Sequence, residues 1–183
     1  MVQLVVSALA QVKKKLREAR FFLGHMRREE QIPRRDPEHF EHYLSAFLSA
    51  ARSVAFKVAF ATGGTWAVVD EWKKTRTNAD DPEFFDAMTD LRDSEVHNDG
   101  VTVSTSPERV PMPVGDSPHA TMYAWFAAHV STGMLGSTEI YIDRHLVNLA
   151  DKPVEAVKAG ERLVELLEDL LHYVSGLTTK EQR

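Results

Sequence analysis

Apolar residues recur in this chain at intervals of three and four positions, the spacing that places them on one face of an α-helix. The clearest stripe, in residues 2–31, consists of Val5, Leu9, Val12, Leu16, Ala19, Leu23 and Met26. Similar stripes run through residues 37–61, 82–97 and 153–175. The pattern therefore predicts long helices over these four ranges.

Proline, glycine and capping residues mark where these helices begin and end. Asp36-Pro37-Glu38 combines an N-cap, a proline at the first helical position and an acid in the first turn, and Asp81-Pro82-Glu83 repeats this signal. Gly63-Gly64 interrupts the second helix, so a separate short helix is expected over residues 65–75. Gly176 is expected to close the last helix in a left-handed conformation.

The region between residues 100 and 150 has a different character, with four prolines at 107, 111, 113 and 118. Met122–Val130 and Thr138–Asp143 are predicted to be two strands joined by a glycine-containing loop, and a helix is the alternative for residues 120–130. The predicted fold class is mainly α: a bundle of about four long helices with a small β-hairpin insertion between the third and last long helices. No linker or repeat divides the chain, so a single domain over residues 1–183 is expected.

Composition narrows the class of protein further. Hydrophobic residues make up 43% of the 183 positions and charged residues 27%, as in ordinary globular domains. The absence of cysteine excludes disulfides, thiolate metal sites and cysteine nucleophiles, and it favours the cytoplasm. The apolar start of the chain has no basic region before it, and no uninterrupted apolar run approaches the roughly 18 residues of a membrane helix. Neither a signal peptide nor a membrane contact is predicted.

The net charge of −5 conceals an uneven distribution. Residues 13–35 contain nine Lys and Arg against three Glu, a local balance of +6, so the remainder carries −11. An acidic chain is a poor non-specific ligand for nucleic acid, but one basic helix can attract phosphate locally. A solvated helix surface is the simpler interpretation of the same residues.

The candidate chemistry lies in the segment from Leu91 to Gly100, which reads LRDSEVHNDG. It resembles the Arg-x4-6-His signature of HEPN domains, all-helical bundles in which a polar residue commonly follows the arginine, as Asp93 follows Arg92 here. Three other pairs share the bare spacing, but they lie in a basic amphipathic helix or across the Pro37 junction: Arg20/His25, Arg34/His39 and Arg35/His42. Five residues turn a helix by roughly 140°, so Arg92 and His97 converge only if the helix ends at the histidine.

The resemblance implies a metal-independent endoribonuclease that works as a homodimer, with the motifs of two protomers in one cleft. His97 would take a proton from a ribose 2′-hydroxyl, since an imidazole with a pKa of roughly 6.5 can do so at neutral pH. Arg92 would hold the scissile phosphate, and Asp93 would orient Arg92 or repel RNA. The resemblance also leaves open a protein partner of the antitoxin type. One toxin subgroup has a tyrosine two residues after the histidine, where this chain has Asp99.

Two other functions compete with this one. The carboxylates beside Arg92 and the acidic net charge are equally compatible with a bundle that binds a partner without catalysis. A DinB-like metal site could draw on His42, His129 and His145, although nothing in the sequence marks these residues as convergent. No cofactor-binding motif is recognisable, so no cofactor is predicted.

Overall fold

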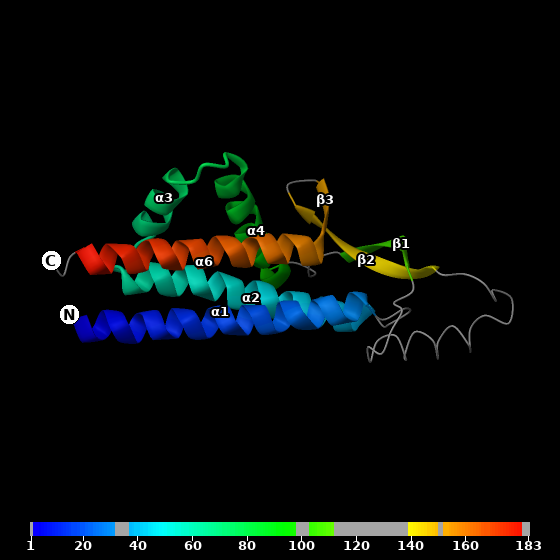
Figure 1. Cartoon of the computed structure of the whole chain (residues 1–183), viewed down its shortest axis with the longest axis horizontal. Coiled ribbons are helices and arrows are strands. Elements are labelled where there is room, and N and C mark those ends of the chain that lie inside the picture. The colour runs from blue at the N-terminus through cyan, green and yellow to red at the C-terminus, as the bar shows by residue number, and fades with distance from the viewer. Residues whose placement is uncertain (1, 32–36, 98–102, 112–138, 150–151, 181–183) are drawn as a thin grey trace, which may run out of the picture.

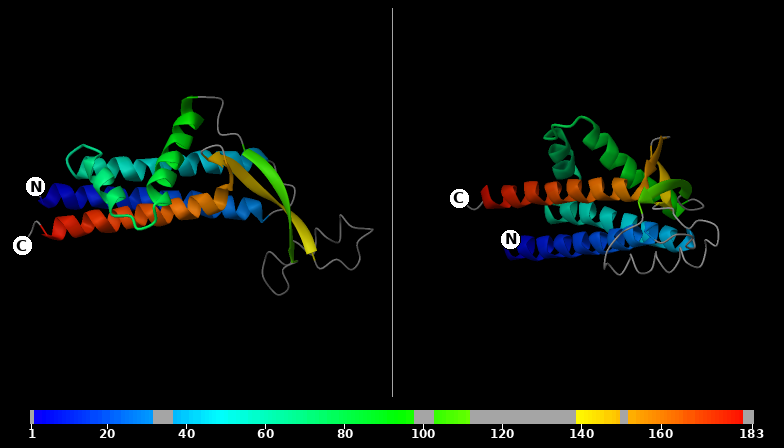
Figure 2. Two further views of the ribbon diagram at one scale, coloured as in Figure 1. Left: turned by 90° about the horizontal axis from the view of Figure 1, so that it is seen from above. Right: turned by 45° about the vertical axis from the view of Figure 1, so that its right-hand side comes forward.

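The fold is mainly helical with a small antiparallel sheet, as the hydrophobic pattern predicts. A computed structural model describes residues 2–31, 37–97, 103–111, 139–149 and 152–180, and the side chains of most of these residues. The long helices are α1 (Val2–Glu30), α2 (Pro37–Ala61) and α6 (Ala156–Lys180), which run side by side along the molecule (Figure 1). Two shorter helices, α3 (Ala67–Lys74) and α4 (Asp80–His97), lie across α2 and α6 (Figure 2).

The helix boundaries follow the local signals closely. α2 begins at Pro37 and ends at Ala61, and α4 ends at His97. After α2 the chain reverses through Gly63 and Gly64, whose φ angles of 118° and 80° lie in the left-handed region that favours glycine. The amide of Gly64 donates to the carbonyl of Ala59 at 2.9 Å, which satisfies one of the carbonyls left open at the helix end.

One continuous core joins the helices and the sheet. It is lined by the predicted apolar faces, and its largest fully buried side chains are Trp72, Phe40, Phe47, Phe85 and Met26. α6 approaches α1 and α2 closely because Gly160 has no side chain: a Cβ built there would lie 2.8 Å from Leu23 Cδ1 and 3.3 Å from Phe47 Cζ. By length and apolar composition α2 could also cross a membrane, with a mean hydropathy of 1.4 over its best window. In this fold it is a central helix of the bundle and half of that window is buried.

Within the described residues, the sheet has three strands, one of which overlaps a predicted strand. β1 (Val103–Pro111) pairs with β2 (Glu139–Leu149), and β2 pairs with β3 (Lys152–Glu155), all antiparallel and in the order β1-β2-β3. The second strand of the predicted hairpin, Thr138–Asp143, corresponds to the start of β2, whereas its first strand, Met122–Val130, lies outside the described residues. The proline-rich segment after Val103 is itself a strand because β1 is at the sheet edge, where a missing N–H is tolerated.

Two predictions about the last helix are wrong, one about its start and one about its end. Residues 153–155 belong to β3 and the helix begins at Ala156, because Pro153 lies in an edge strand and not in a first helical turn. Gly176 does not end the helix, which continues to Lys180, and its φ is not in the left-handed region. An isolated glycine in an otherwise regular helix costs only about 1 kcal/mol, so the surrounding residues carry the helix past it.

A buried ionic cluster attaches the sheet to the end of α1. Glu30 is 4% exposed and accepts hydrogen bonds from the backbone N–H of His145 at 3.2 Å and from Arg144 Nη1 at 3.1 Å. Burial raises the pKa of the Glu30 carboxyl, although both hydrogen bonds act to lower it. Arg144 also binds Glu108 of β1, and the ring of His145 stacks on Phe40 with centroids 3.7 Å apart. The sheet is therefore held at the bundle end opposite the chain termini (Figure 1).

Candidate functional site

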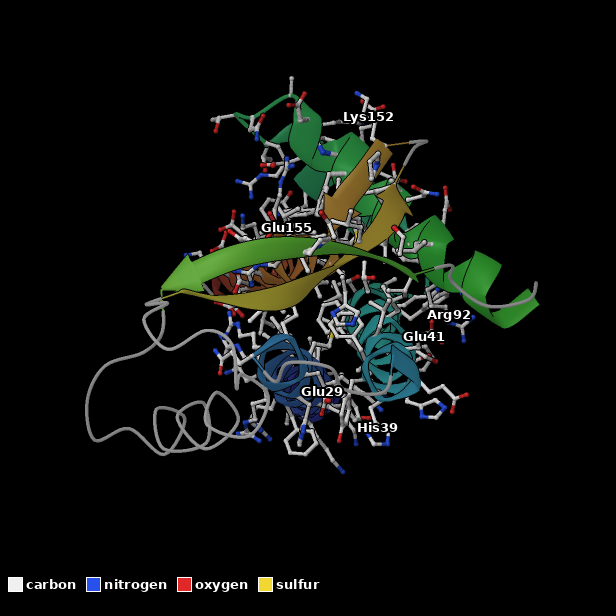
Figure 3. All side chains as sticks on the ribbon, turned by 90° about the vertical axis from the view of Figure 1, so that its right-hand side faces the viewer. Glu29, His39, Glu41, Arg92, Lys152 and Glu155 are labelled. Atoms are coloured by element: carbon white, nitrogen blue, oxygen red, sulfur yellow. The ribbon has the colours of Figure 1, made fainter. Side chains whose placement is uncertain are left out.

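Arg92 lies in a pocket between α2 and α4. The pocket has a volume of about 290 Å³ and is lined by Ser49, Arg52, Ser53, Phe56, Lys57 and Arg92. Figure 3 looks along the bundle and shows Arg92 on α4, next to α2. Five of the lining residues come from successive turns of α2, and only Arg92 comes from α4. The pocket therefore exists because the chain folds α4 back over α2.

The electrostatic character of the pocket is set by three cations. Arg52 and Lys57 are the only Lys, Arg, Asp or Glu residues between residues 42 and 61, and both line the pocket with Arg92. Burial, followed by the positive charge of Arg92, lowers the pKa of Arg52, while Asp90 acts in the opposite direction. A guanidinium nevertheless stays charged at any physiological pH. The positive charges of Arg52 and Arg92 are thus close enough to repel each other in one pocket.

Packing fixes the position of Arg52. Its guanidinium carbon lies 4.9 Å from the centre of the Phe56 ring, a cation–π contact between residues one helical turn apart. Phe56 in turn contacts Trp66 edge to face, with centroids 5.1 Å apart. The hydroxyl of Ser53 donates to the backbone carbonyl of Ser49 at 2.8 Å, as small hydroxyl residues do inside helices. The arginine therefore has a supported orientation on a rigid helix.

Such a set of side chains can bind an oxyanion. Guanidinium groups donate paired hydrogen bonds that match the oxygens of phosphate or carboxylate, and Lys57 adds a third positive charge. An anion between Arg52 and Arg92 would also offset the repulsion of the two guanidinium groups. The pocket volume accommodates a phosphodiester group. The arrangement suits recognition of a phosphate or carboxylate group.

The structure places the three predicted catalytic residues on α4. Arg92 lines the pocket, and Asp93 and His97 lie in the last turns of the same helix. The side chains of Asp93 and His97 fall outside the described part of the chain. The expected helix does reach His97, while the convergence of His97 with Arg92 stays a prediction.

Among the other arginine–histidine pairs, the described residues show both members only of Arg20/His25, and these two do not converge. Arg20 forms an ion pair with Glu168 of α6, whereas His25 stacks on Tyr43 of α2 with ring centroids 4.6 Å apart. These two partners lie on different helices, so Arg20 and His25 point apart. Arg34 and Arg35 lie outside the described residues.

The proposed metal ligands are not brought together by the described residues. His145 is buried against Phe40 while His42 is exposed, and His129 lies outside the described ranges. Within the described part of the chain, His, Asp and Glu form no group of three or more that could hold a metal ion.

Sequence reasoning missed Arg52 and Lys57 as members of the site. A signal was present, because two cations interrupt a helix that is otherwise apolar or small over about five turns. Isolated cations of this kind in a helix with a buried face often have a specific partner. Their proximity to Arg92 could not be read from the sequence, since 40 positions separate Arg52 from Arg92.

Comparison of the chain with protein-family models, with curated proteins and with solved structures found no match. The fold and the site thus define a mainly helical bundle with a cationic pocket between its second and fourth helices.

Proposed function

We propose that this chain is a HEPN-like protein that binds RNA phosphate in the α2–α4 pocket and cleaves the strand there without a metal ion. The observation that carries the proposal is the convergence of Arg52, Lys57 and Arg92 from two helices on one pocket. Clustered cations in a concave site are the arrangement expected for binding a phosphodiester.

The proposed reaction is an internal transesterification. His97 takes the proton of the ribose 2′-hydroxyl, and the 2′-oxygen attacks the adjacent phosphorus. The bond from phosphorus to the 5′-oxygen breaks, and that oxygen receives a proton from the protonated His97 of the second protomer, whose motif would share the cleft. The products are a 2′,3′-cyclic phosphate and a 5′-hydroxyl. Arg92 and Arg52 stabilise the negative charge that develops on the non-bridging oxygens.

A homodimer is part of this proposal, and exposed aromatic residues beside the pocket support it. Phe56, which lines the pocket, is 45% exposed, and Phe60, one turn further along α2, is 80% exposed. Large apolar side chains that are exposed next to a polar site are typical of surfaces that a protein partner covers. A second copy seated on this face would bring its own α4 toward the pocket.

The test is cleavage of single-stranded RNA in the presence of EDTA. The expected result is product ending in a 2′,3′-cyclic phosphate, with loss of at least about 100-fold in rate for both Arg92→Ala and His97→Ala. Arg52→Ala should lower the rate in the same way, although the sequence alone did not indicate it. His39→Ala and His172→Ala change exposed histidines on other helices and should cleave at the wild-type rate.

Cleavage that persists in the Arg92 and His97 variants, or that EDTA abolishes, would refute the assignment. The second candidate is a binding protein that uses the pocket without catalysis, which the influence of Asp90 on Arg52 favours. A carboxylate near the cations weakens their attraction for a polyanion and suits a smaller or less charged ligand. This candidate predicts anion binding that depends on Arg52 and Arg92 with no strand cleavage.

A further inference from the structure

The outer face of α1 combines unneutralised cations with an exposed aromatic ring. On a helix that turns roughly 100° per residue, five residues fall within an arc of about 80° opposite the buried stripe. We name this set the outer stripe, and it consists of Lys14, Arg17, Phe21, His25 and Arg28. Its cations are exposed, as is Phe21 at 60% of its surface. Figures 1 and 2 show α1 along one edge of the bundle.

The cations of the outer stripe differ from three other cations of α1. Arg20 and Arg27, on the side facing α6, form ion pairs with Glu168 and Glu161, and Lys15 binds Glu18. Among the described residues, Lys14, Arg17 and Arg28 have no ion-pair partner. Among the described cations of α1, Lys14, Arg17 and Arg28 thus place their charges on the face that points away from the bundle.

Phe21 is held in place by neighbouring rings. It meets His25 edge to face with centroids 4.5 Å apart, and His25 stacks on Tyr43 of α2 at 4.6 Å with an interplanar angle of 17°. A second edge contact joins Phe21 to Phe22 at 5.4 Å. An exposed phenylalanine with its ring orientation fixed by neighbours is a prepared surface for stacking, because little rotational freedom is left to lose.

We infer that the outer stripe binds a single strand of nucleic acid, with a base stacked on Phe21 and phosphates bound by Lys14, Arg17 and Arg28. Alternating aromatic and cationic contacts are the general mode of recognition for single strands. From Lys14 to Arg28 the helix rises about 21 Å, the length of roughly six stacked nucleotides. A duplex has no unstacked base to offer to Phe21, so charge and ring together favour the single strand.

The outer stripe lies where it could hold the RNA strand that the α2–α4 pocket cleaves. This part of the inference rests on the proposed function. α1 and α2 are antiparallel, and the His25–Tyr43 stack sets their register. Arg17 is then level with about residue 51 of α2, beside the pocket residues Ser49 and Arg52 along the bundle axis. A strand bound on the outer stripe would be separated from the α2–α4 pocket by the width of one helix.

The experiment measures, by fluorescence anisotropy, the affinity for labelled oligoadenylate and for a blunt RNA duplex of equal length. The full chain carries His97→Ala so that the RNA is not cleaved during the measurement. The expected result is preference for the single strand and a loss of about tenfold in affinity for Phe21→Leu, which Phe21→Trp restores. Arg17→Gln should lower the slope of log affinity against log salt by about 0.7. Lys74→Gln, which changes a cation on α3 that is 70% exposed, should change nothing.

Unchanged affinity in Phe21→Leu, or equal affinity for the duplex, would overturn the inference. So would binding to phosphatidylserine vesicles that depends on Phe21 while oligoadenylate binding does not. Cleavage by the wild-type chain separates the two proposals: binding of oligoadenylate that depends on Phe21, in a wild-type protein that cleaves no RNA, supports the stripe and refutes the nuclease. Cleavage of a dinucleotide, too short to reach the stripe, should be the same in wild type and in Phe21→Leu.

Discussion

Gly160→Ala tests the close approach of α6 to the other two long helices. Alanine in place of glycine stabilises a helix interior by about 1 kcal/mol when there is room for the methyl group. At residue 160 the new Cβ would lie 2.8 Å from Leu23 Cδ1 and within 3.4 Å of the Phe47 ring. Both neighbours are core residues with 3% or less of their surface exposed, so neither can move without displacing others.

The magnitude follows from these two opposing effects. Overpacking a filled core costs about 1–3 kcal/mol, which exceeds the gain in helix propensity. Gly160→Ala should therefore lower the free energy of unfolding by up to about 2 kcal/mol. Gly24→Ala and Gly176→Ala are matched controls in α1 and α6, where a Cβ meets nothing within 4 Å. They should raise the free energy of unfolding by about 0.5–1 kcal/mol.

Thermal and urea unfolding followed by circular dichroism measure the difference. For a chain of this size, 1 kcal/mol corresponds to about 2–4 °C in Tm. A double-mutant cycle adds a sharper check, because Leu23→Ala removes the atom that clashes and should make Gly160→Ala less harmful in that background. A rise in Tm for Gly160→Ala equal to that of Gly24→Ala would refute the packing described for α6.

Three further predictions follow from the sheet attachment and the pocket. Burial raises the pKa of the Glu30 carboxyl above 4.5, so the folded state binds the carboxyl proton more tightly than the unfolded state does. The stability that this proton contributes is therefore present in acid and is lost as pH rises through the pKa of the folded state. Urea titrations from about pH 4 upward should therefore show that Glu30→Gln gains stability over wild type as pH increases, and a constant difference would contradict this. Phe56→Ser with Phe60→Ser should halve the mass seen by light scattering at micromolar concentration, whereas a wild-type monomer would remove the dimer from the proposal. Arg52→Gln should weaken binding of inorganic phosphate by about tenfold, as measured by calorimetry, and unaltered binding would place the anion elsewhere.

Local sequence determined the helices because the signals for them are local. The apolar stripes and the Asp-Pro-Glu starts place α1, α2 and α4 within two residues of their observed ends. The same reasoning failed at Pro153 and made no prediction for residues 103–111. There the pairing of β2 with both neighbours decided the conformation, and a strand's partner is not encoded in its own residues.

The residues of the candidate site likewise fall into those that the sequence indicated and those that only the tertiary structure brought together. Arg92, Asp93 and His97 were recognisable from the sequence because they lie within six positions of one another at the end of one helix. The pocket required tertiary structure, since Arg52 and Lys57 belong to α2 and meet Arg92 only after α3 and α4 have folded back across it. The sequence likewise contained the basic charge of α1, but only packing separated the cations neutralised by α6 from those of the outer stripe. Charge and periodicity are properties of single residues and their near neighbours, whereas proximity in space depends on which faces pack together.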